Sequence, residues 1–246
     1  VALADTYPSG LVNSGTPSLA STCGGTATAT AGGNALTLSG GTLAGGGSCT
    51  LTVQVVAAAA GSYVNSSGPI TASNANAGAS ANATLTVLSP PVATKSFSPA
   101  VVGPNQASTL SITIANPNAA AITGVAFTDA YPSGLVNSAS PALASTCGGT
   151  ATGAAGAGSL ALSGGTIAAS GSCTVSVSVE SATPGSYANA TGAIATTNAG
   201  TGASAGATLR VIGNLAVTKA FVPPSIGVND VSLLTITLIN PNTDPV

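Results

Sequence analysis

Apolar and polar residues alternate along many short segments of this chain. In residues 110–114, 173–179 and 234–238, a Leu, Ile, Val or Cys occupies every second position. A period of two places successive side chains on opposite faces of a strand, so each segment predicts a half-buried antiparallel β-strand. Gly- and Pro-rich stretches separate these segments, and no window shows a helical period. The pattern therefore predicts an all-β fold, a sandwich of the immunoglobulin type.

One set of residues occurs twice, at a constant offset of 124 positions. The residues of the first set and their second occurrences are Tyr7 and Tyr131, Cys23 and Cys147, Cys49 and Cys173, Tyr63 and Tyr187, and Leu85 and Leu209. A fixed period without insertion is the signature of a repeat architecture. We therefore expect tandem immunoglobulin-like repeats of 124 residues.

The expected linkers fall inside the chain, out of phase with the repeat as it is counted from residue 1. They are the stretches Ser89-Pro-Pro-Val and Gly213-Asn-Leu. We expect residues 1–89 to be a domain without its first two strands, 90–213 a complete domain, and 214–246 the opening strands of a following domain. Residues 214–246 of one unit would then complete residues 1–89 of the next, by continuity or by strand donation. Copies of the chain itself, end to end, are the expected partners.

Charge is almost absent from the sequence. Charged residues make up 3% of the chain, against about 25% in an average soluble domain. The net charge of −2 argues against an electrostatic nucleic-acid binder. The chain has no His, so a conventional catalytic triad is excluded, and paired carboxylates within one repeat are missing. We expect neither an enzyme nor a cofactor, and no apolar run is long enough to span a bilayer.

The four cysteines form one pair per repeat. The members of each pair, Cys23 and Cys49, and Cys147 and Cys173, stand at the same spacing. Metal sites favour closer pairs and His partners, so disulfides are the better interpretation and no metal site is expected. Disulfides persist in oxidising compartments, which predicts an extracellular or cell-surface location.

Four motifs in a fixed order carry a family resemblance. They begin at Thr94 (Thr-Lys-Ser-Phe-Ser-Pro), Ser108 (Ser-Thr-Leu-Ser-Ile-Thr-Ile-Ala-Asn-Pro-Asn), Gly124 (Gly-Val-Ala-Phe-Thr-Asp-Ala-Tyr-Pro-Ser-Gly-Leu) and Gly171 (Gly-Ser-Cys-Thr-Val). Together they resemble the conserved-repeat, immunoglobulin-like domain of unknown function of long bacterial surface and secreted proteins. The resemblance covers essentially the whole chain. It implies a bacterial exported protein with a structural or adhesive role, and no established biochemical activity.

One Lys and one Asp occur in both copies of the repeat, as Lys95 and Lys219 and as Asp5 and Asp129. Their strand positions share the parity of apolar neighbours, which predicts that both charges face the core. Buried charges need partners, so one interpretation is a static Lys–Asp pair tied to amides.

The other interpretation is an autocatalytic isopeptide crosslink, the Lys–Asp–Asn arrangement of collagen-adhesin and pilin domains, which the chain loosely resembles. Lys95 would be the nucleophile, Asp129 the acid and Asn189 the preferred acceptor, with Asn116 and Asn198 as alternatives. Asp5 and Asn65 have no Lys upstream, so only Lys219 of a neighbouring unit would serve them. Asn65, Asn82 and Asn189 also begin matches to the glycosylation tripeptide, and this modification would compete with the acceptor role of Asn189.

Two functions remain open on the sequence. The first is a structural subunit or segment of an extracellular bacterial filament or fibrous surface protein built from head-to-tail repeats. The alternative is the stalk of a cell-surface adhesin, a binding protein whose tip lies elsewhere. A regular Thr array for ice or glycan binding is weaker, because Thr30 becomes Ala154 in the second copy.

Overall fold

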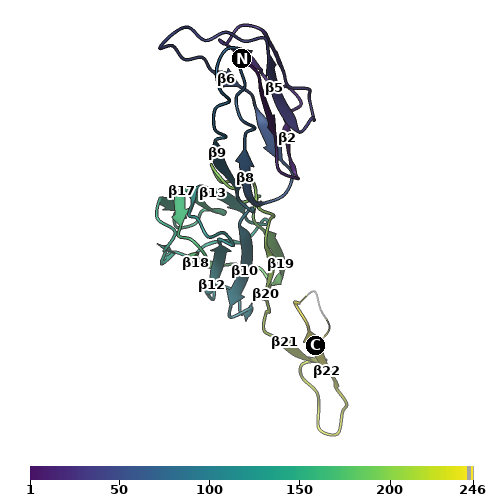
Figure 1. Ribbon diagram of the computed structural model, residues 1–246. Helices are drawn as coiled ribbons and strands as arrows, with labels where there is room; N and C mark the ends of the chain where they lie inside the picture. Colours follow the sequence, from purple (N-terminus) through teal and green to yellow (C-terminus); the bar gives the residue numbers. More distant parts are fainter. Residues whose placement is uncertain (243–244, 246) are drawn as a thin grey trace. The chain divides into compact units, whose positions relative to one another are not determined.

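The computed structural model describes residues 1–242 and 245, and every regular element in this part of the chain is a β-strand (Figure 1). The chain divides into two compact units, Val1–Ser89 (unit 1) and Pro90–Val246 (unit 2). The division falls at the Pro-rich stretch that begins with Ser89. The all-β class predicted from the period-two pattern is confirmed.

The first part of unit 2 is a β-sandwich. Its strands are β10 (Val92–Ser98), β11 (Val101–Val102), β12 (Ser108–Ala115), β13 (Ile122–Ala130), β14 (Val136–Asn137), β15 (Ala144–Ser145), β16 (Thr150–Thr152), β17 (Ser159–Ile167), β18 (Ser172–Glu180), β19 (Gly185–Ala190) and β20 (Gly206–Val211). One sheet has the order β10–β12–β18–β14, with β15 also on β18. The strands β13–β17–β16 and β11–β20–β19 form two further sheets.

The core of unit 2 follows the alternation in the sequence. Every second residue of β12 and β18 is buried, and Ile112 and Val177 are both 0% exposed. Val125 of β13 and Leu209 of β20, in the other sheets, are also fully buried. Each sheet therefore contributes one apolar face to a shared interior, as in an immunoglobulin-like sandwich.

One strand pair departs from the antiparallel pattern expected. Strand β11 pairs in parallel with β20, through Val101 opposite Arg210 and Val102 opposite Val211. After β10 the chain leaves the β12 sheet and joins the β20 edge, where Val102 is buried. A two-residue strand is too short to show a period of two, so the sequence pattern does not reveal this change of sheet.

The strands of unit 1 are counterparts, at the repeat offset, of β13 to β20 in unit 2. They are β1 (Leu3–Thr6), β2 (Leu11–Asn13), β3 (Ala20–Ser21), β4 (Thr26–Thr28), β5 (Ala35–Ser39), β6 (Leu51–Thr52), β7 (Val55–Ala57), β8 (Gly61–Ser66) and β9 (Asn82–Val87). They pair as β1–β5–β4, β2–β7, β3–β6 and β8–β9. The segment equivalent to β18 is broken into β6 and β7.

The last two strands form an isolated hairpin, β21 (Ala216–Val222) and β22 (Leu233–Ile239). Lys219 lies opposite Ile236, just as Lys95 lies opposite Ile112 in the β10–β12 pair. All residues of both hairpin strands are exposed. The compact-unit division groups this hairpin with unit 2, whereas the sequence predicts that it opens a further domain.

Candidate functional site

A buried ion pair crosses the interior of unit 2. Lys95 projects from β10 and Asp129 from β13, and the side chains of both residues are 0% exposed. The Nζ atom of Lys95 donates a hydrogen bond of 2.6 Å to Oδ2 of Asp129. The period-two parity that buries Phe97 and Phe127 also turns these two charges inward. The inward orientation predicted for Lys95 and Asp129 is therefore what the structure shows.

Asn189 of β19 completes the cluster, which we call the core triad (Lys95, Asp129 and Asn189). Its Nδ2 atom donates to the same Oδ2 of Asp129, at 3.2 Å. The Asn189 residue is 3% exposed. Two buried acceptors of the triad, Oδ1 of Asp129 and Oδ1 of Asn189, have no hydrogen-bond partner. An unpartnered buried acceptor costs free energy, so one more donor hydrogen within the cluster would stabilise it.

Burial and charge act in opposite directions on Lys95. Burial lowers the pKa of its ammonium, and the hydrogen bond and negative charge of Asp129 partly oppose that shift. Tyr131, beside the same carboxylate, has a raised pKa, first because it is buried and second because of the Asp129 charge. Deprotonating Lys95 to its neutral amine therefore costs less free energy than deprotonating a solvated lysine.

The other two acceptor candidates lie away from Lys95. Asn116 donates to the carbonyls of Ala120, Ile167 and Ala168, and its Oδ1 accepts from Asn118. Asn198 bonds the backbone of Thr123 and Ala121. Both amides therefore form hydrogen bonds with the backbone near β13 and β17. Of the three amides considered from the sequence, Asn189 is the one that the structure places on Asp129.

Unit 1 holds two members of an equivalent triad. Asn65 of β8 donates to both carboxylate oxygens of Asp5, at 3.0 and 2.9 Å. The Oδ1 atom of Asn65 is buried without a partner. Lys219, the lysine at the equivalent repeat position, lies on β21 with its Nζ 5.8 Å from the ring centroid of Phe221. It is exposed rather than buried, because the hairpin has no sheet against it.

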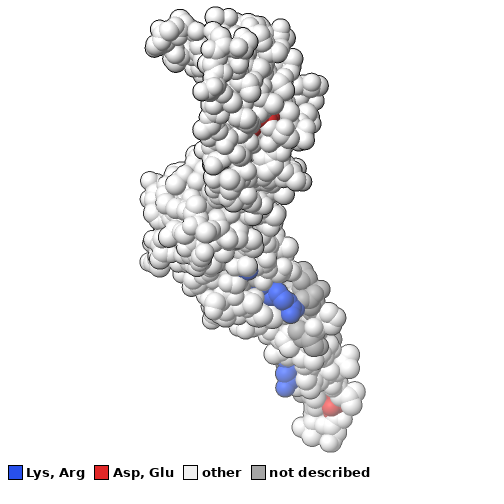
Figure 2. All heavy atoms as spheres, in the orientation of Figure 1, with Lys and Arg blue, Asp and Glu red and all other residues white. Residues whose placement is uncertain are grey.

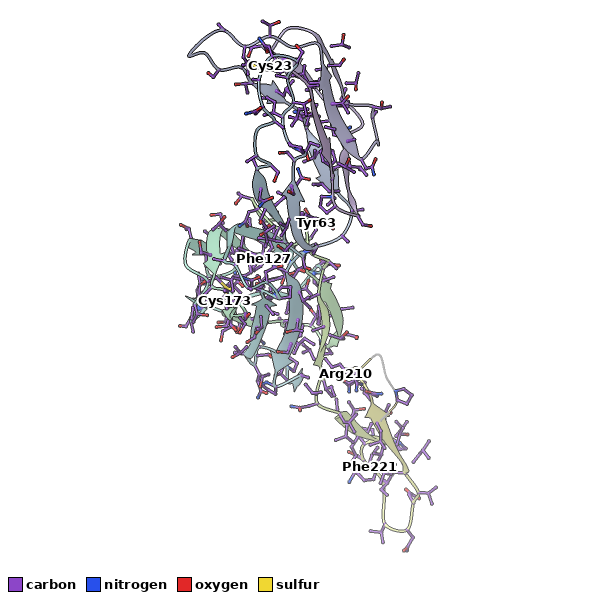
Figure 3. All side chains as sticks on the ribbon, viewed as in Figure 1. Cys23, Tyr63, Phe127, Cys173, Arg210 and Phe221 are labelled. Carbon is purple, nitrogen blue, oxygen red and sulfur yellow. A yellow bond between two sulfur atoms is a disulfide. The ribbon has the colours of Figure 1, made fainter. Side chains whose placement is uncertain are left out.

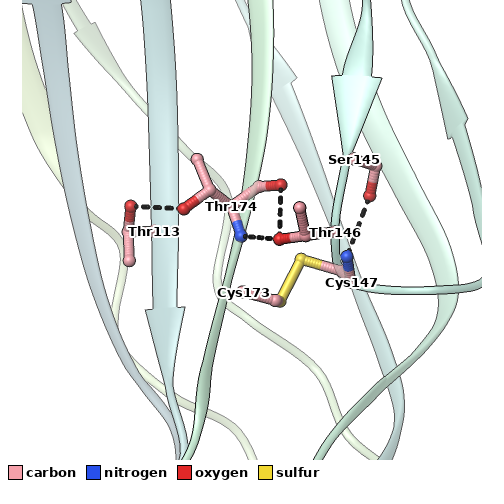
Figure 4. Close-up of a disulfide and its surroundings, with 6 residues drawn as sticks. All are labelled: Thr113, Ser145, Thr146, Cys147, Cys173 and Thr174. Carbon is pink, nitrogen blue, oxygen red and sulfur yellow. Dashed lines mark hydrogen bonds between the residues drawn. A yellow bond between two sulfur atoms is a disulfide. The ribbon is translucent and has the colours of Figure 1, made fainter.

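Both expected disulfides are present. Cys23 joins Cys49, and Cys147 joins Cys173, each over 26 residues. Figure 4 shows the second bridge, where Cys173 of β18 meets Cys147 in the segment after β15. Beside the bridge, the hydroxyl of Thr146 accepts a hydrogen bond from the backbone N–H of Thr174 and donates one to the backbone carbonyl of Thr174. The bridge therefore ties the loop after β15 to a core strand.

A second buried polar network, around Tyr131 and Asn137, was not predicted from the sequence. Tyr131 donates to Oδ1 of Asn137 at 2.9 Å, and Asn137 donates to two backbone carbonyls. Tyr7 and Asn13 repeat these contacts in unit 1. Asn13 and Asn137 are separated by the repeat offset, and this recurrence was the sequence signal that could have predicted the network. Tyr187 instead bonds the carbonyl of Thr183, four residues upstream, as expected of a corner tyrosine (Tyr63, labelled in Figure 3, does likewise).

The described surface offers little other chemistry. Figure 2 shows a face that is almost entirely uncharged. Among the described residues, no three His, Cys, Asp or Glu side chains are grouped as metal ligands. The same part of the chain contains no helix long and apolar enough to cross a bilayer. The core triad is therefore the strongest chemical feature of the described chain.

Comparison with solved structures finds bacterial adhesins. The C-terminal domain of the Streptococcus agalactiae AgI/II polypeptide BspA aligns with a TM-score of 0.47 and 9% identity, covering 85% of this chain and 84% of that one. The collagen adhesin of S. aureus aligns with a TM-score of 0.35 and 10% identity, covering 97% and 84%. Adhesin InvE of Yersinia pseudotuberculosis aligns with a TM-score of 0.28 and 18% identity, covering 84% and 50%. These likenesses are too distant to carry any argument about function.

The family comparison is more informative. A search of curated proteins finds no match. One protein-family model matches the chain twice, over residues 1–87 and 91–211, and its description is a domain of unknown function, DUF7933. The shorter match begins part-way through the repeat, at the position equivalent to Val125. Because the two matches together span most of the chain, the protein belongs to the DUF7933 family.

Proposed function

We propose that this chain is a load-bearing segment of an extracellular bacterial fibre, in which immunoglobulin-like units follow one another head to tail. The observation that carries the proposal is the core triad, which links β10 to β19 through Asp129 of β13. These are the first strand and the second-last strand of the complete sandwich. The two disulfides support an oxidising, extracytoplasmic location. In this proposal the protein is structural and turns over no substrate.

The chemistry that we propose for the triad is an isopeptide bond between Lys95 and Asn189. One proton passes from the Lys95 ammonium to the Asp129 carboxylate, which leaves a neutral amine and a neutral carboxyl. The amine attacks Cγ of Asn189, so a Cγ–Nζ bond forms, the Cγ–Nδ2 bond breaks and ammonia leaves. The carboxyl passes a proton to the leaving nitrogen and receives one from the attacking amine. Its proton also supplies the donor that the unpartnered oxygens of Asp129 and Asn189 lack.

Such a bond would change how unit 2 carries tension. A pulling force that enters at β10 would pass through the Lys95–Asn189 bond and leave through β20. Residues 96–188, which include the core strands β12 and β18 and the second disulfide, would lie outside the load path. A sandwich clamped in this way resists unfolding by force, because a covalent bond replaces the hydrogen bonds of the load-bearing strands.

The same clamp would serve a filament subunit or an adhesin stalk. We favour the filament, because the β21–β22 hairpin repeats the register of β10–β12 and so supplies the beginning of another unit. Electron microscopy of the protein distinguishes the two functions. Uniform filaments of this protein alone support the filament, whereas separate molecules that end in a distinct tip support the stalk.

Intact-mass spectrometry of the 246-residue chain tests the proposed bond. With both disulfides counted, we expect a mass lower by one ammonia because of the Lys95–Asn189 bond. Lys95→Arg and Asn189→Ala each abolish this loss, because each removes a reacting group. Asn198→Ala is the matched control and keeps it, because Asn198 bonds only the backbone near β13. A wild-type mass with no ammonia missing would leave the triad a static ion pair and contradict the proposal.

A further inference from the structure

A four-residue motif recurs at the amide that bonds the buried carboxylate of each unit. It reads Asn189-Ala-Thr-Gly in unit 2 and Asn65-Ser-Ser-Gly in unit 1. The first three residues match the glycosylation tripeptide, but Asn189 is 3% exposed and its amide donates to Asp129. Burial therefore closes Asn189 to glycosylation in the folded chain. The third match, Asn82-Ala-Thr, is followed by Leu85 and not by glycine.

The hydroxyl of Thr191 ends the ladder between β19 and β20. In a regular antiparallel ladder, a hydrogen-bonded pair of residues exchanges two backbone bonds. Beyond the last pair of this ladder, the N–H of Thr191 donates to the carbonyl of Ala205, at 2.9 Å. The return bond differs, because the N–H of Ala205 donates to Oγ1 of Thr191, also at 2.9 Å. The side chain thus takes the acceptor place of the Thr191 carbonyl, and the backbone is free to leave the sheet.

Gly192 ties the departing chain to another sheet. Its N–H donates to the carbonyl of Thr128 on β13, at 2.8 Å. The strands β19 and β13 belong to different sheets, so this bond bridges the two. A Cβ on Gly192 would lie 3.0 Å from that carbonyl oxygen, so a larger residue would push the crossing apart. A glycine lets the two backbones approach this closely.

Both bonds lie close to the core triad along the chain. Asn189 stands two residues before Thr191, and both side chains are buried. Asp129 directly follows Thr128 on β13. Thr191 fixes where the β19 ladder ends, and Gly192 fixes that end against β13. The Asn189 amide is thereby held within 3.2 Å of Oδ2 of Asp129, although the two residues come from different sheets.

Unit 1 builds the same crossing with a serine in place of the threonine. The N–H of Ala81 donates to Oγ of Ser67 at 3.1 Å, and the N–H of Gly68 donates to the carbonyl of Ala4 at 2.8 Å. A Cβ on Gly68 would lie 2.7 Å from that oxygen. Asn65 again donates to the carboxylate that follows the crossing. The hydroxyl and the glycine, rather than the threonine methyl, are therefore the shared elements.

We propose that Thr191 and Gly192 are positioning residues, which hold the Asn189 amide on Asp129 for attack by Lys95. The inference deepens the proposed function and rests on it for the reaction, in which the Cγ–Nζ bond forms, the Cγ–Nδ2 bond breaks and ammonia leaves. Both residues act through the backbone that carries Asn189, and not through the reacting atoms. Misplacing a reacting group by about 1 Å costs about 10²-fold in rate. Loss of the Thr191 hydroxyl should therefore slow the reaction although every reacting group is kept.

Cell-free synthesis of the full chain under oxidising conditions, sampled by intact mass, measures the rate of ammonia loss. We expect Thr191→Ala to react about 10²-fold more slowly than the wild type. Thr191→Ser keeps the hydroxyl, as Ser67 does in unit 1, and should restore the wild-type rate. Ser108→Ala is the matched control: it removes another buried hydroxyl, which donates to the carbonyl of Pro99, and should react at the wild-type rate. An unchanged rate in Thr191→Ala, or an equal slowing in Ser108→Ala, would overturn the assignment.

A second measurement does not depend on the reaction. Residues 1–89 contain no lysine, so no reaction within unit 1 consumes the Asn65 amide, and NMR can follow the exchange of its Nδ2 hydrogens. We expect Ser67→Ala to speed this exchange about tenfold and Ser67→Thr to leave it unchanged. Equal exchange in Ser67→Ala and the wild type would overturn the positioning role, even if Thr191→Ala fails to fold. Faster exchange in Ser67→Ala, in a wild-type background that loses no ammonia, would refute the isopeptide bond and leave the positioning role standing.

Discussion

Two residue types that are rare in this chain meet in its interior. Lys95 and Asp129 are fully buried and paired, and Asn189 shares the same carboxylate oxygen. Breaking a buried ion pair by removing one partner typically costs about 3–5 kcal/mol, because the other charge stays buried. Retention of both residues in a chain with 3% charged residues is consistent with a specific chemical role rather than with general solubility.

Asp129→Asn isolates the carboxyl from the rest of the triad. The substitution keeps the shape of the side chain but removes the group that carries the proton, so we expect no Lys95–Asn189 bond. Digestion of the denatured chain with trypsin detects the bond, because trypsin cleaves after a free lysine and not after a lysine whose side chain is amide-linked. Cleavage after Lys95 should be absent in the wild type and complete in the variant. Asp5→Asn, its repeat equivalent in unit 1, should leave Lys95 resistant; cleavage there would refute the assignment.

The raised pKa of Tyr131 makes the free energy of unfolding fall at alkaline pH. Its pKa is raised in the folded chain by burial and by the Asp129 charge, while the unfolded side chain ionises near its usual value of about 10. The stability that this residue contributes is therefore fully present below pH 10 and is lost as the pH rises above it. Chemical denaturation from pH 8 to about 11 should show a steeper decline in the unfolding free energy for the wild type than for Tyr131→Phe. Equal slopes would contradict the raised pKa.

At the scale of elements, the period-two pattern predicted the strands that matter most. Leu110, Ile112 and Ile114 define β12, and the buried parity of Lys95 follows from the same pattern. The pattern did not reveal β11, which is too short, nor the division of one strand into β6 and β7. The two repeats are similar in sequence at this segment, so local alternation does not reveal that β18 pairs with β12 whereas β6 and β7 pair with β3 and β2.

Hydrogen exchange should separate the equivalent strands of the two units. Amides of residues 172–180 belong to a central strand between β12 and the short strands β14 and β15, so slow exchange is expected. Amides of residues 48–56 lie in a segment with only the two short strands β6 and β7, so faster exchange is expected there. Equal protection of the two segments would contradict this difference in strand pairing.

The whole molecule contains unit 1, a sandwich in unit 2 with the buried core triad, and a hairpin with the register of β10 and β12. Its surface is nearly uncharged, so long-range charge repulsion does little to keep molecules apart. The stability of the folded chain should also be nearly insensitive to salt, because few surface charges are present to be screened.

Pulling single molecules by their two ends tests the load-bearing claim most directly. With the Lys95–Asn189 bond in place, residues between these positions cannot extend, whatever force unfolds unit 1. In Lys95→Arg the same residues, apart from the disulfide loop, should add on the order of 200 Å of contour length at 3.3–3.6 Å per residue. We expect this increment to be absent from the wild type and present in Lys95→Arg. An equal increment in both proteins would contradict a load-bearing Lys95–Asn189 bond.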